Sequence, residues 1–254
     1  MRVKVLYQEL LPDEFIERVN ACPIAYLPLG TLEWHSFHLP YGPDMMIPLE
    51  MFKHIAEKAG GVVLPPLFIG PDGAIEHDGK LYFGMDYASF EDGYPQHLAG
   101  SMHYVPEPFF IQLLEYIIKN LTRSGFAGLV AFGHGPSVDA LMKNRERLEN
   151  SFNIRIFGLA DFCGGIPGDH AAFYETAMAL ALFPELVNMQ QLPDEVIPVS
   201  VWGRDPRISN LKEEGERMIK LYEEQAVAKL IELNTELPKP NLKLEYHHVR
   251  KLIY

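Results

Sequence analysis

The chain of 254 residues contains only two cysteines and no long apolar run. Cys22 and Cys163 lie far apart and neither belongs to a Cys-x-x-Cys pair, which argues against a disulfide framework and is typical of a reducing compartment. No apolar stretch approaches the roughly 20 residues of a membrane span. Charged residues also occupy the N-terminal positions where a secretion signal has its apolar core. We therefore expect a cytoplasmic protein with no membrane partner.

Basic residues are scarce as well. Lys and Arg number 22 against 34 Asp and Glu, which gives a formal net charge of −12, and no basic run occurs. An acidic surface repels phosphate backbones, so we expect no nucleic-acid partner. The Gly-rich turn "GGIPGDH" lacks the Lys-Ser/Thr pair of a phosphate-binding P-loop. Neither cysteine lies in a context that activates a nucleophile.

Short apolar runs alternate with longer, helix-like segments along the chain. Four runs are bounded by Gly or charge and suit strands buried on both faces, namely 24–31, 61–70, 128–133 and 154–161. Five segments have the apolar spacing or the charge pattern of helices, namely 48–60, 107–125, 137–152, 171–187 and 209–234. This alternation predicts an α/β fold in one domain over residues 1–254, a three-layer α/β/α sandwich with a mainly parallel sheet.

One segment, residues 71–106, breaks the alternation. It is rich in Gly, Asp and Tyr and follows neither the helix nor the strand period for long. A connection this long inside a compact domain is usually functional, so we expect an insertion or lid over a binding site. His97 within it is a candidate for facing substrate, because loops over strand ends carry specificity. We expect His77 and His103 to be solvated loop residues.

Polar side chains gather where three of the predicted strands end. In open parallel sheets, ligands bind beyond the carboxyl ends of the strands. The three segments are "GTLEWHSFHLPYGPD", "AFGHGPS" and "GGIPGDHAAFYETA". Their carboxylates and imidazoles are Glu33, His35, His38, Asp44, His134, Asp169, His170 and Glu175. Distant parts of the chain therefore deliver metal-competent groups to one edge of the sheet.

Histidine and carboxylate together suit zinc, manganese or ferrous iron. Glu33 and His35 alternate by two, so an extended backbone points both to the same side. The two oxygens of Asp44 could bridge two ions. A single His or Asp after a strand is nevertheless usually a cap or a turn residue. Spacing alone leaves both interpretations open.

Four blocks, in order from about residue 24 to 225, resemble the creatininase (creatinine amidohydrolase) family. "LPLGTLEWHSFHLPYGPD" resembles the family's strand followed by Glu-x-His, His-Leu-Pro and Asp, and "SGFAGLVAFGHGPS" its Gly-His-Gly turn. "GDHAAFYETAMALALFPELV" is similar to its His-Ala-Gly…Glu-Thr-Ser helix, and "GRDPRISNLKEEGERM" to its late Gly-x-Pro segment. The resemblance implies an α/β/α fold, two divalent metal ions, hydrolysis of amide C–N bonds and a homo-oligomer.

The resemblance also implies roles for individual residues. The positions of the metal ligands are Glu33, His35, Asp44 as the bridge, and His134. Asp169 and His170 stand where the family has an acidic residue and a catalytic histidine. Glu175 matches the glutamate of the Glu-Thr-Ser stretch. Ser101 matches the threonine of the family's Pro-Gly-Thr stretch. Apart from the resemblance, Trp34 is expected to pack around the imidazoles, with stacking on substrate as the alternative, so the candidates for contacting substrate are Trp34, His97 and Ser101.

The sequence departs from the creatinine-hydrolysing enzyme at the Gly-His-Gly turn. Pro136 occupies the position of a glutamate ligand and cannot ligate, and resemblance to other members implies that Glu175 replaces it. Phe132 and Ser137 stand where asparagines are usual. These changes argue against creatinine as the substrate and leave the four ligand positions intact.

We therefore expect a metal-dependent amidohydrolase that cleaves a non-peptide C–N amide bond, linear or cyclic, in a small molecule through a metal-activated water. His170, oriented by Asp169, would deliver the proton to the leaving nitrogen. Two alternatives stay open. One is a family deformylase or peptide-trimming enzyme of cofactor biosynthesis, and the other is a small-molecule binding protein that has lost catalysis.

Overall fold

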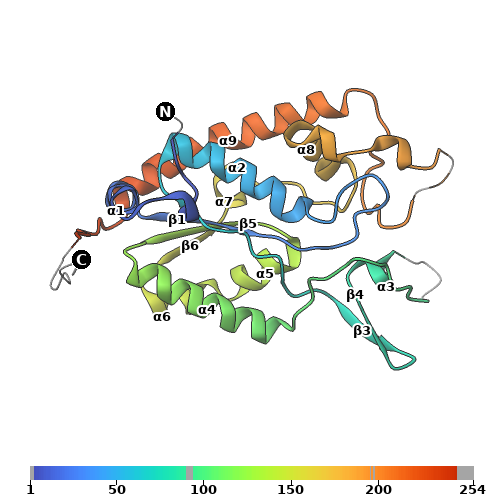
Figure 1. The fold of residues 1–254 in the computed structure, drawn as a ribbon, viewed down its shortest axis with the longest axis horizontal. Helices are drawn as coiled ribbons and strands as arrows, with labels where there is room; N and C mark the ends of the chain where they lie inside the picture. Colours follow the sequence, from blue (N-terminus) through green and yellow to red (C-terminus); the bar gives the residue numbers. More distant parts are fainter. Residues whose placement is uncertain (1–2, 90–93, 195, 197, 245–254) are drawn as a thin grey trace, which may run out of the picture.

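A parallel sheet lies between two layers of helices in the computed structural model, which describes residues 3–89, 94–194, 196 and 198–244 (Figure 1). The strands, in the order β2-β1-β5-β6, are β2 (Val62–Val63), β1 (Ile24–Leu29), β5 (Gly128–Gly133) and β6 (Arg155–Gly158). All three pairings are parallel. The predicted three-layer α/β/α sandwich is confirmed.

Alternate residues of the strands pack into two hydrophobic cores on opposite faces of the sheet. Ile24 and Tyr26 of β1 face one core, and Ala25 and Leu27 face the other. The helices of the first core are α2 (Pro43–Ala59), α7 (Ala160–Cys163), α8 (Phe173–Leu182) and α9 (Leu211–Glu236). Those of the second core are α1 (Pro12–Ala21), α4 (Glu107–Arg123), α5 (Gly135–Lys143) and α6 (Arg145–Phe152). Every residue of β1 is buried, as a strand covered on both faces requires.

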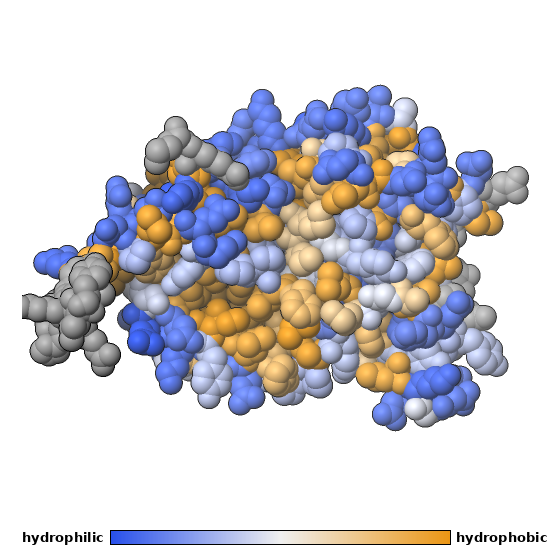
Figure 2. Space-filling view, viewed as in Figure 1, coloured by the Kyte–Doolittle hydropathy of each residue, from blue (hydrophilic) through white to orange (hydrophobic). Residues whose placement is uncertain are grey.

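The long helix α9 lies on the outside of its layer. Figure 2 shows mostly hydrophilic residues along the edge of the molecule where α9 runs. Its inner face buries apolar side chains that include Met218, Tyr222 and Leu230. This agrees with the outer, solvated helix predicted from its charge pattern. None of the helices in the described ranges has the length and hydropathy needed to cross a bilayer.

The boundaries of several elements differ from the prediction. The strand predicted over 61–70 ends at Val63, because Pro65 and Pro66 offer no N–H for a ladder. The helix predicted over 48–60 begins at Pro43, which places Asp44 in its first turn. The helix over 137–152 is divided at Asn144, and the one over 171–187 ends at Leu182. Helix α1 was not predicted.

The irregular segment 71–106 contains a short hairpin and one helical turn. The elements are β3 (Ala74–His77), β4 (Lys80–Phe83) and α3 (Met85–Ala88). Asp78 and Gly79 form the turn, both with positive φ, as two-residue hairpins prefer. The remaining short elements are the 3-10 helices η1 (Tyr7–Glu9), η2 (Pro184–Leu186) and η3 (Met189–Gln191).

The contact between α8 and α9 yields a prediction with an unusual sign. Gly→Ala inside a helix normally stabilises by about 1 kcal/mol. At Gly215 an added Cβ would overlap the carbonyl oxygen of Ala177, so the helices would have to separate. We expect Gly215→Ala to lower the free energy of unfolding by about 1–3 kcal/mol, measured by urea denaturation. Exposed Glu213→Ala is the control and should change little. A Gly215→Ala variant as stable as the parent would contradict this packing.

A histidine–glutamate pair links α2 to α9 and predicts a pH dependence. His54 Nδ1 lies 2.7 Å from Glu223 Oε1, and this hydrogen bond raises the pKa of His54. Because the folded pKa lies above the unfolded value of about 6.5, the pair stabilises the fold at lower pH and loses its effect as pH rises through the folded pKa. We expect His54→Gln to lower Tm more at pH 6 than at pH 9. An equal loss at both would show that the pair contributes no charge effect.

Candidate active site

Parallel pairing brings the ends of β1 and β5 together. The two strands pair from Ile24↔Gly128 to Leu29↔Gly133, so the segments that follow them leave the sheet side by side. His134 directly follows β5 and precedes α5. A third segment joins them, where His170 exchanges two backbone hydrogen bonds with Trp202 just before α8. A cavity of about 610 Å³ lies among these three segments.

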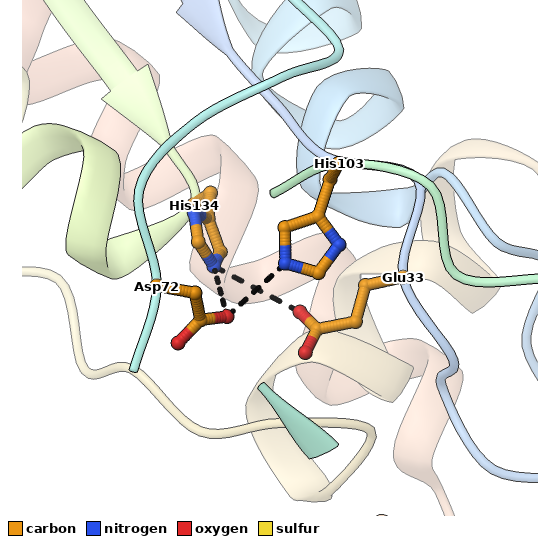
Figure 3. Close-up of side chains that lie close together, drawn as sticks. All are labelled: Glu33, Asp72, His103 and His134. Atoms are coloured by element: carbon orange, nitrogen blue, oxygen red, sulfur yellow. Dashed lines mark hydrogen bonds and ion pairs between the residues drawn. The ribbon is translucent and has the colours of Figure 1, made fainter. Parts of the chain in front are cut away.

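Four side chains form a first cluster, defined as Glu33, Asp72, His103 and His134 (Figure 3). One potential ligand atom of each lies within 4.8 Å of the others. His134 Nε2 is 3.5 Å from Asp72 Oδ2 and 3.8 Å from Glu33 Oε2. His103 Nε2 is 3.2 Å from the same Asp72 oxygen. Two of these residues, Glu33 and His134, were predicted as ligands.

A second cluster, defined as His35, His170 and Glu175, lies beside the first. His35 Nε2 is 3.3 Å from Glu175 Oε1 and 3.4 Å from Asp44 Oδ2. The His35 and His170 rings stack with centroids 4.1 Å apart. Glu33 Oε2 of the first cluster lies 4.0 Å from His170 Nδ1. All five predicted ligands are therefore in or against these two clusters, while their roles as ligands stay predictions.

The spacing of these atoms fits divalent cations better than hydrogen bonds. Around a tetrahedral zinc ion, with metal–ligand distances of about 2.0–2.2 Å, neighbouring ligand atoms lie about 3.4 Å apart. A good N–H···O hydrogen bond is shorter, about 2.9 Å. The contacts of His35 and His134 span 3.3 to 3.8 Å. His35 Nε2 is also buried without a hydrogen-bond partner. The donor set therefore suits a metal centre.

Backbone carbonyls determine which ring nitrogens are free. His35 Nδ1 lies 3.0 Å from the carbonyl oxygen of Glu33 and must donate to it, which leaves the Nε2 lone pair facing Glu175. His170 Nε2 lies 2.8 Å from the carbonyl oxygen of Trp34 and likewise donates. His134 Nδ1 lies 3.0 Å from Ser137 Oγ. Such hydrogen bonds on the far nitrogen are typical of metal-binding histidines.

Unbalanced negative charge dominates the cavity. Its described lining includes six carboxylates and neither Lys nor Arg. Burial would lower the pKa of His35, but the charges of Glu175 and Asp44 outweigh it and raise the pKa to about 10. The pKa of His134 is raised against the effect of burial, chiefly by Asp72. The site therefore favours added positive charge, which bound cations would supply.

Asp44 joins the second cluster from the first turn of α2. The hydroxyl of Thr31 donates to its Oδ2, the oxygen that faces His35. Burial would raise the pKa of Asp44, but the neighbouring imidazoles, His35 first, hold it below its usual value. The side chain is nearly buried, so its charge is poorly screened by water. Its predicted role as a bridge between two ions stays a prediction.

Asp169 has a different task from the one expected. Its two oxygens accept the backbone N–H groups of Tyr174, at 2.7 Å, and Glu175, at 3.0 Å, in the first turn of α8. Burial raises its pKa to about 6. His170 is held instead by the carbonyl of Trp34. The expectation that Asp169 orients His170 is therefore wrong, because its carboxylate is committed to the helix start.

The three residues expected to contact substrate lie outside the described lining of the cavity. Trp34 packs edge-on against Phe37, and its backbone N–H donates to Ser101 Oγ at 3.0 Å. His97 is exposed. Trp34 and Ser101 thus support the loop that carries the ligands. The cavity wall instead contains Trp202, a residue that is 69% exposed and was not predicted to contact substrate.

Two residues of the first cluster were also missed. His103 was expected to be solvated, and it is 1% exposed, so that expectation is wrong. Asp72 follows the strand predicted over 61–70, and the rule that ligands lie beyond strand ends would have selected it. No local pattern marks His103. His38, one of the imidazoles predicted to gather at the strand ends, lies outside both clusters; its Nε2 is 2.9 Å from Thr176 Oγ1, and burial lowers its pKa to about 4.

Known proteins resemble this chain along most of its length. The family model described as "Creatininase: Creatinine amidohydrolase" matches residues 8–228. Creatinine amidohydrolase of Pseudomonas putida is 27% identical over 239 residues, which cover 81% of this chain and 84% of that protein. The 3-dehydro-scyllo-inosose hydrolase of Thermotoga maritima is 23% identical over 211 residues, which cover 75% of this chain and 60% of that protein.

Solved structures share the fold. A crystal structure of creatinine amidohydrolase matches with a TM-score of 0.71 at 21% identity, covering 93% of this chain and 99% of that chain. Creatininase structures of the same fold include one described as a Zn-Zn type and one as a Mn form. Because the family model spans most of the sequence, the resemblance is confirmed. This chain belongs to the creatininase family and is a hydrolase that acts on carbon–nitrogen amide bonds.

Proposed function

We propose that the protein hydrolyses a non-peptide amide bond, linear or cyclic, in a small molecule, using two divalent metal ions of zinc, manganese or iron. One observation carries the proposal. Carboxylates and imidazoles of two clusters line one cavity, with ligand-like spacing and with no Lys or Arg among the described lining residues. When bound, such ions polarise an amide carbonyl and make water a nucleophile at neutral pH.

The chain's own residues divide the work of holding the ions. Glu33 and His134 would hold one, and His35 and Glu175 the other, with Asp44 between them. Glu175 would then supply the ligand that Pro136 cannot. Its Oε1 faces His35 at 3.3 Å, while its Oε2 accepts the backbone N–H of Ala171 at 2.6 Å, which fixes the carboxylate.

His170 is the residue that moves the proton. The carbonyl of Trp34 keeps its Nε2 protonated, so Nδ1 presents a lone pair beside Glu33 Oε2. From there Nδ1 takes a proton from the attacking water and returns it to the leaving nitrogen, as general acid–base catalysis requires. Trp34 is thus a positioning residue, acting through its backbone. His170 also lines the cavity, where a substrate would lie.

The cavity wall indicates a substrate with an apolar part. Phe132, Ile166, Met178 and Trp202 line the cavity that holds the clusters. Phe132 and Pro136 stand where the creatinine-hydrolysing enzyme has polar residues, which favours another amide. Hydrolysis of formamides would indicate the deformylase alternative, and hydrolysis of short peptides the peptide-trimming alternative.

The single domain, the homo-oligomer and the cytoplasmic location stay predictions from the sequence.

The first test is metal content. After chelation and reloading with zinc or manganese, we expect two ions per chain, measured by elemental analysis after gel filtration. His35→Gln removes a donor from the second cluster and should leave one ion. His77→Gln, in the β3–β4 hairpin, is the matched control and should keep both. A parent protein without stoichiometric metal would contradict the proposal and favour a binding protein that has lost catalysis.

The second test separates catalysis from metal binding. The parent protein, reloaded with each metal, is screened against lactams, formamides and short amides. On the best substrate, His170→Asn should lower kcat by about 10²- to 10⁴-fold, because the proton carrier is lost. Both ions should remain bound. Undiminished turnover, or loss of an ion together with turnover, would show that His170 is not the acid–base residue.

A further inference from the structure

We propose that Asp72 is an additional metal ligand, positioned by His103, through which a bound cation fastens the hairpin segment (residues 71–89) to the sheet as one wall of the active site. The inference rests on the proposed metal centre and extends it to residues that lie outside the motifs by which the family was identified. Both residues belong to the irregular segment between β2 and α4.

Asp72 presents one oxygen to the cluster and engages the other elsewhere. Its Oδ1 accepts the backbone N–H of Gly73 at 2.7 Å. Its Oδ2 lies 3.5 Å from His134 Nε2 and 3.2 Å from His103 Nε2. The side chain is only 14% exposed, so water screens its charge weakly. Oδ2 is therefore aimed at the same point as Glu33 and His134, as Figure 3 shows.

His103 holds Asp72 in this position. The imidazole side chain is completely buried, and its ring packs edge-on against Phe83 at 5.0 Å. Its Nδ1 is buried with no hydrogen-bond partner, so the contact to Asp72 through Nε2 is its polar anchor. Burying the Nδ1 atom without a hydrogen-bond partner costs free energy, because the nitrogen loses its hydration. A role in positioning a ligand accounts for that cost.

The hairpin segment rests directly on the two carboxylates. The backbone N–H of Met85 donates to Glu33 Oε1 at 3.2 Å. Gly84 has a positive φ of 56°, and an added Cβ would overlap Glu33 Oε1 and lie 2.8 Å from Asp72 Oδ2. Only glycine allows this approach without strain. The segment therefore meets the first cluster at Asp72, Gly84 and Met85.

Among the helices and strands, β3, β4 and α3 contact chiefly one another. The other attachments of this segment run mainly to residues 94–106, through Asp86, which accepts the backbone N–H of Leu98, and through the ring of Phe83, which packs on His103 and Tyr104. Within the first cluster, Glu33 and Asp72 come from different parts of the chain and carry the same charge. A cation between them replaces repulsion with attraction and joins the segment to β1 and β5. Because Asp72 and Met85 line the cavity, the ion would thereby complete its wall.

The experiment compares Asp72→Asn with Asp78→Asn, an exposed carboxylate at the tip of the same hairpin. Zinc affinity is measured by competition with a chromophoric chelator, and hydrogen exchange of residues 72–89 is followed with and without zinc. Asp72→Asn should lower the affinity for one of the two ions at least tenfold and abolish the zinc-dependent protection of the segment against hydrogen exchange. Asp78→Asn should match the parent in both. His103→Gln should weaken the same ion by about 10- to 100-fold, as loss of a ligand's support does.

The outcomes separate this inference from the proposed function. Parent protein that binds no zinc would remove the metal centre itself. Parent protein with two ions, together with Asp72→Asn of equal affinity and equal protection, would overturn only the role of Asp72. If Asp72→Asn does not fold, as judged by circular dichroism, His103→Gln decides. Unchanged zinc affinity and protection in that variant would overturn the inference.

Discussion

Mutual repulsion among closely spaced, largely buried carboxylates is the constraint on which the rest of this site depends. Glu33, Asp44, Asp72 and Glu175 reach one cavity that has no Lys or Arg among its described lining residues. In a poorly screened environment such charges are unfavourable unless a cation accompanies them. The same negative charge raises the pKa values of His35 and His134. Divalent ions balance this charge more completely than protonated imidazoles do, and they leave the imidazoles free to act as ligands.

The fold produces this concentration of charge through strand pairing. Because β1 and β5 pair in parallel over six residues, the segments that follow the two strands leave the sheet at the same edge. Backbone carbonyls then orient the imidazoles, with Glu33 holding His35 and Trp34 holding His170. Rigid backbone, rather than mobile side chains, therefore determines where the lone pairs point. This preorganisation is what a metal site requires of its support.

The sequence predicted the parts of the site that follow from short-range rules. The strand-end rule selected Glu33 and His35, which enter the two adjacent clusters, and likewise His134 and the segment with His170. Prediction from the sequence failed where the role of a residue depends on contacts with distant parts of the chain. His103 is buried by Phe83 and Asp72, which no local pattern shows. The family resemblance implied that Asp169 acts with His170, yet its oxygens accept backbone N–H groups at the start of α8. Element boundaries failed for a similar reason, as with the strand shortened at Pro65.

The central claim is that cations occupy both clusters. Crystals grown with manganese and measured at the manganese absorption edge test it most directly. The account predicts two anomalous peaks in the cavity, one bounded by Glu33 and His134 and the other by His35 and Glu175. An anomalous map with no peak there, with the carboxylates instead bonded to protonated imidazoles, would contradict it.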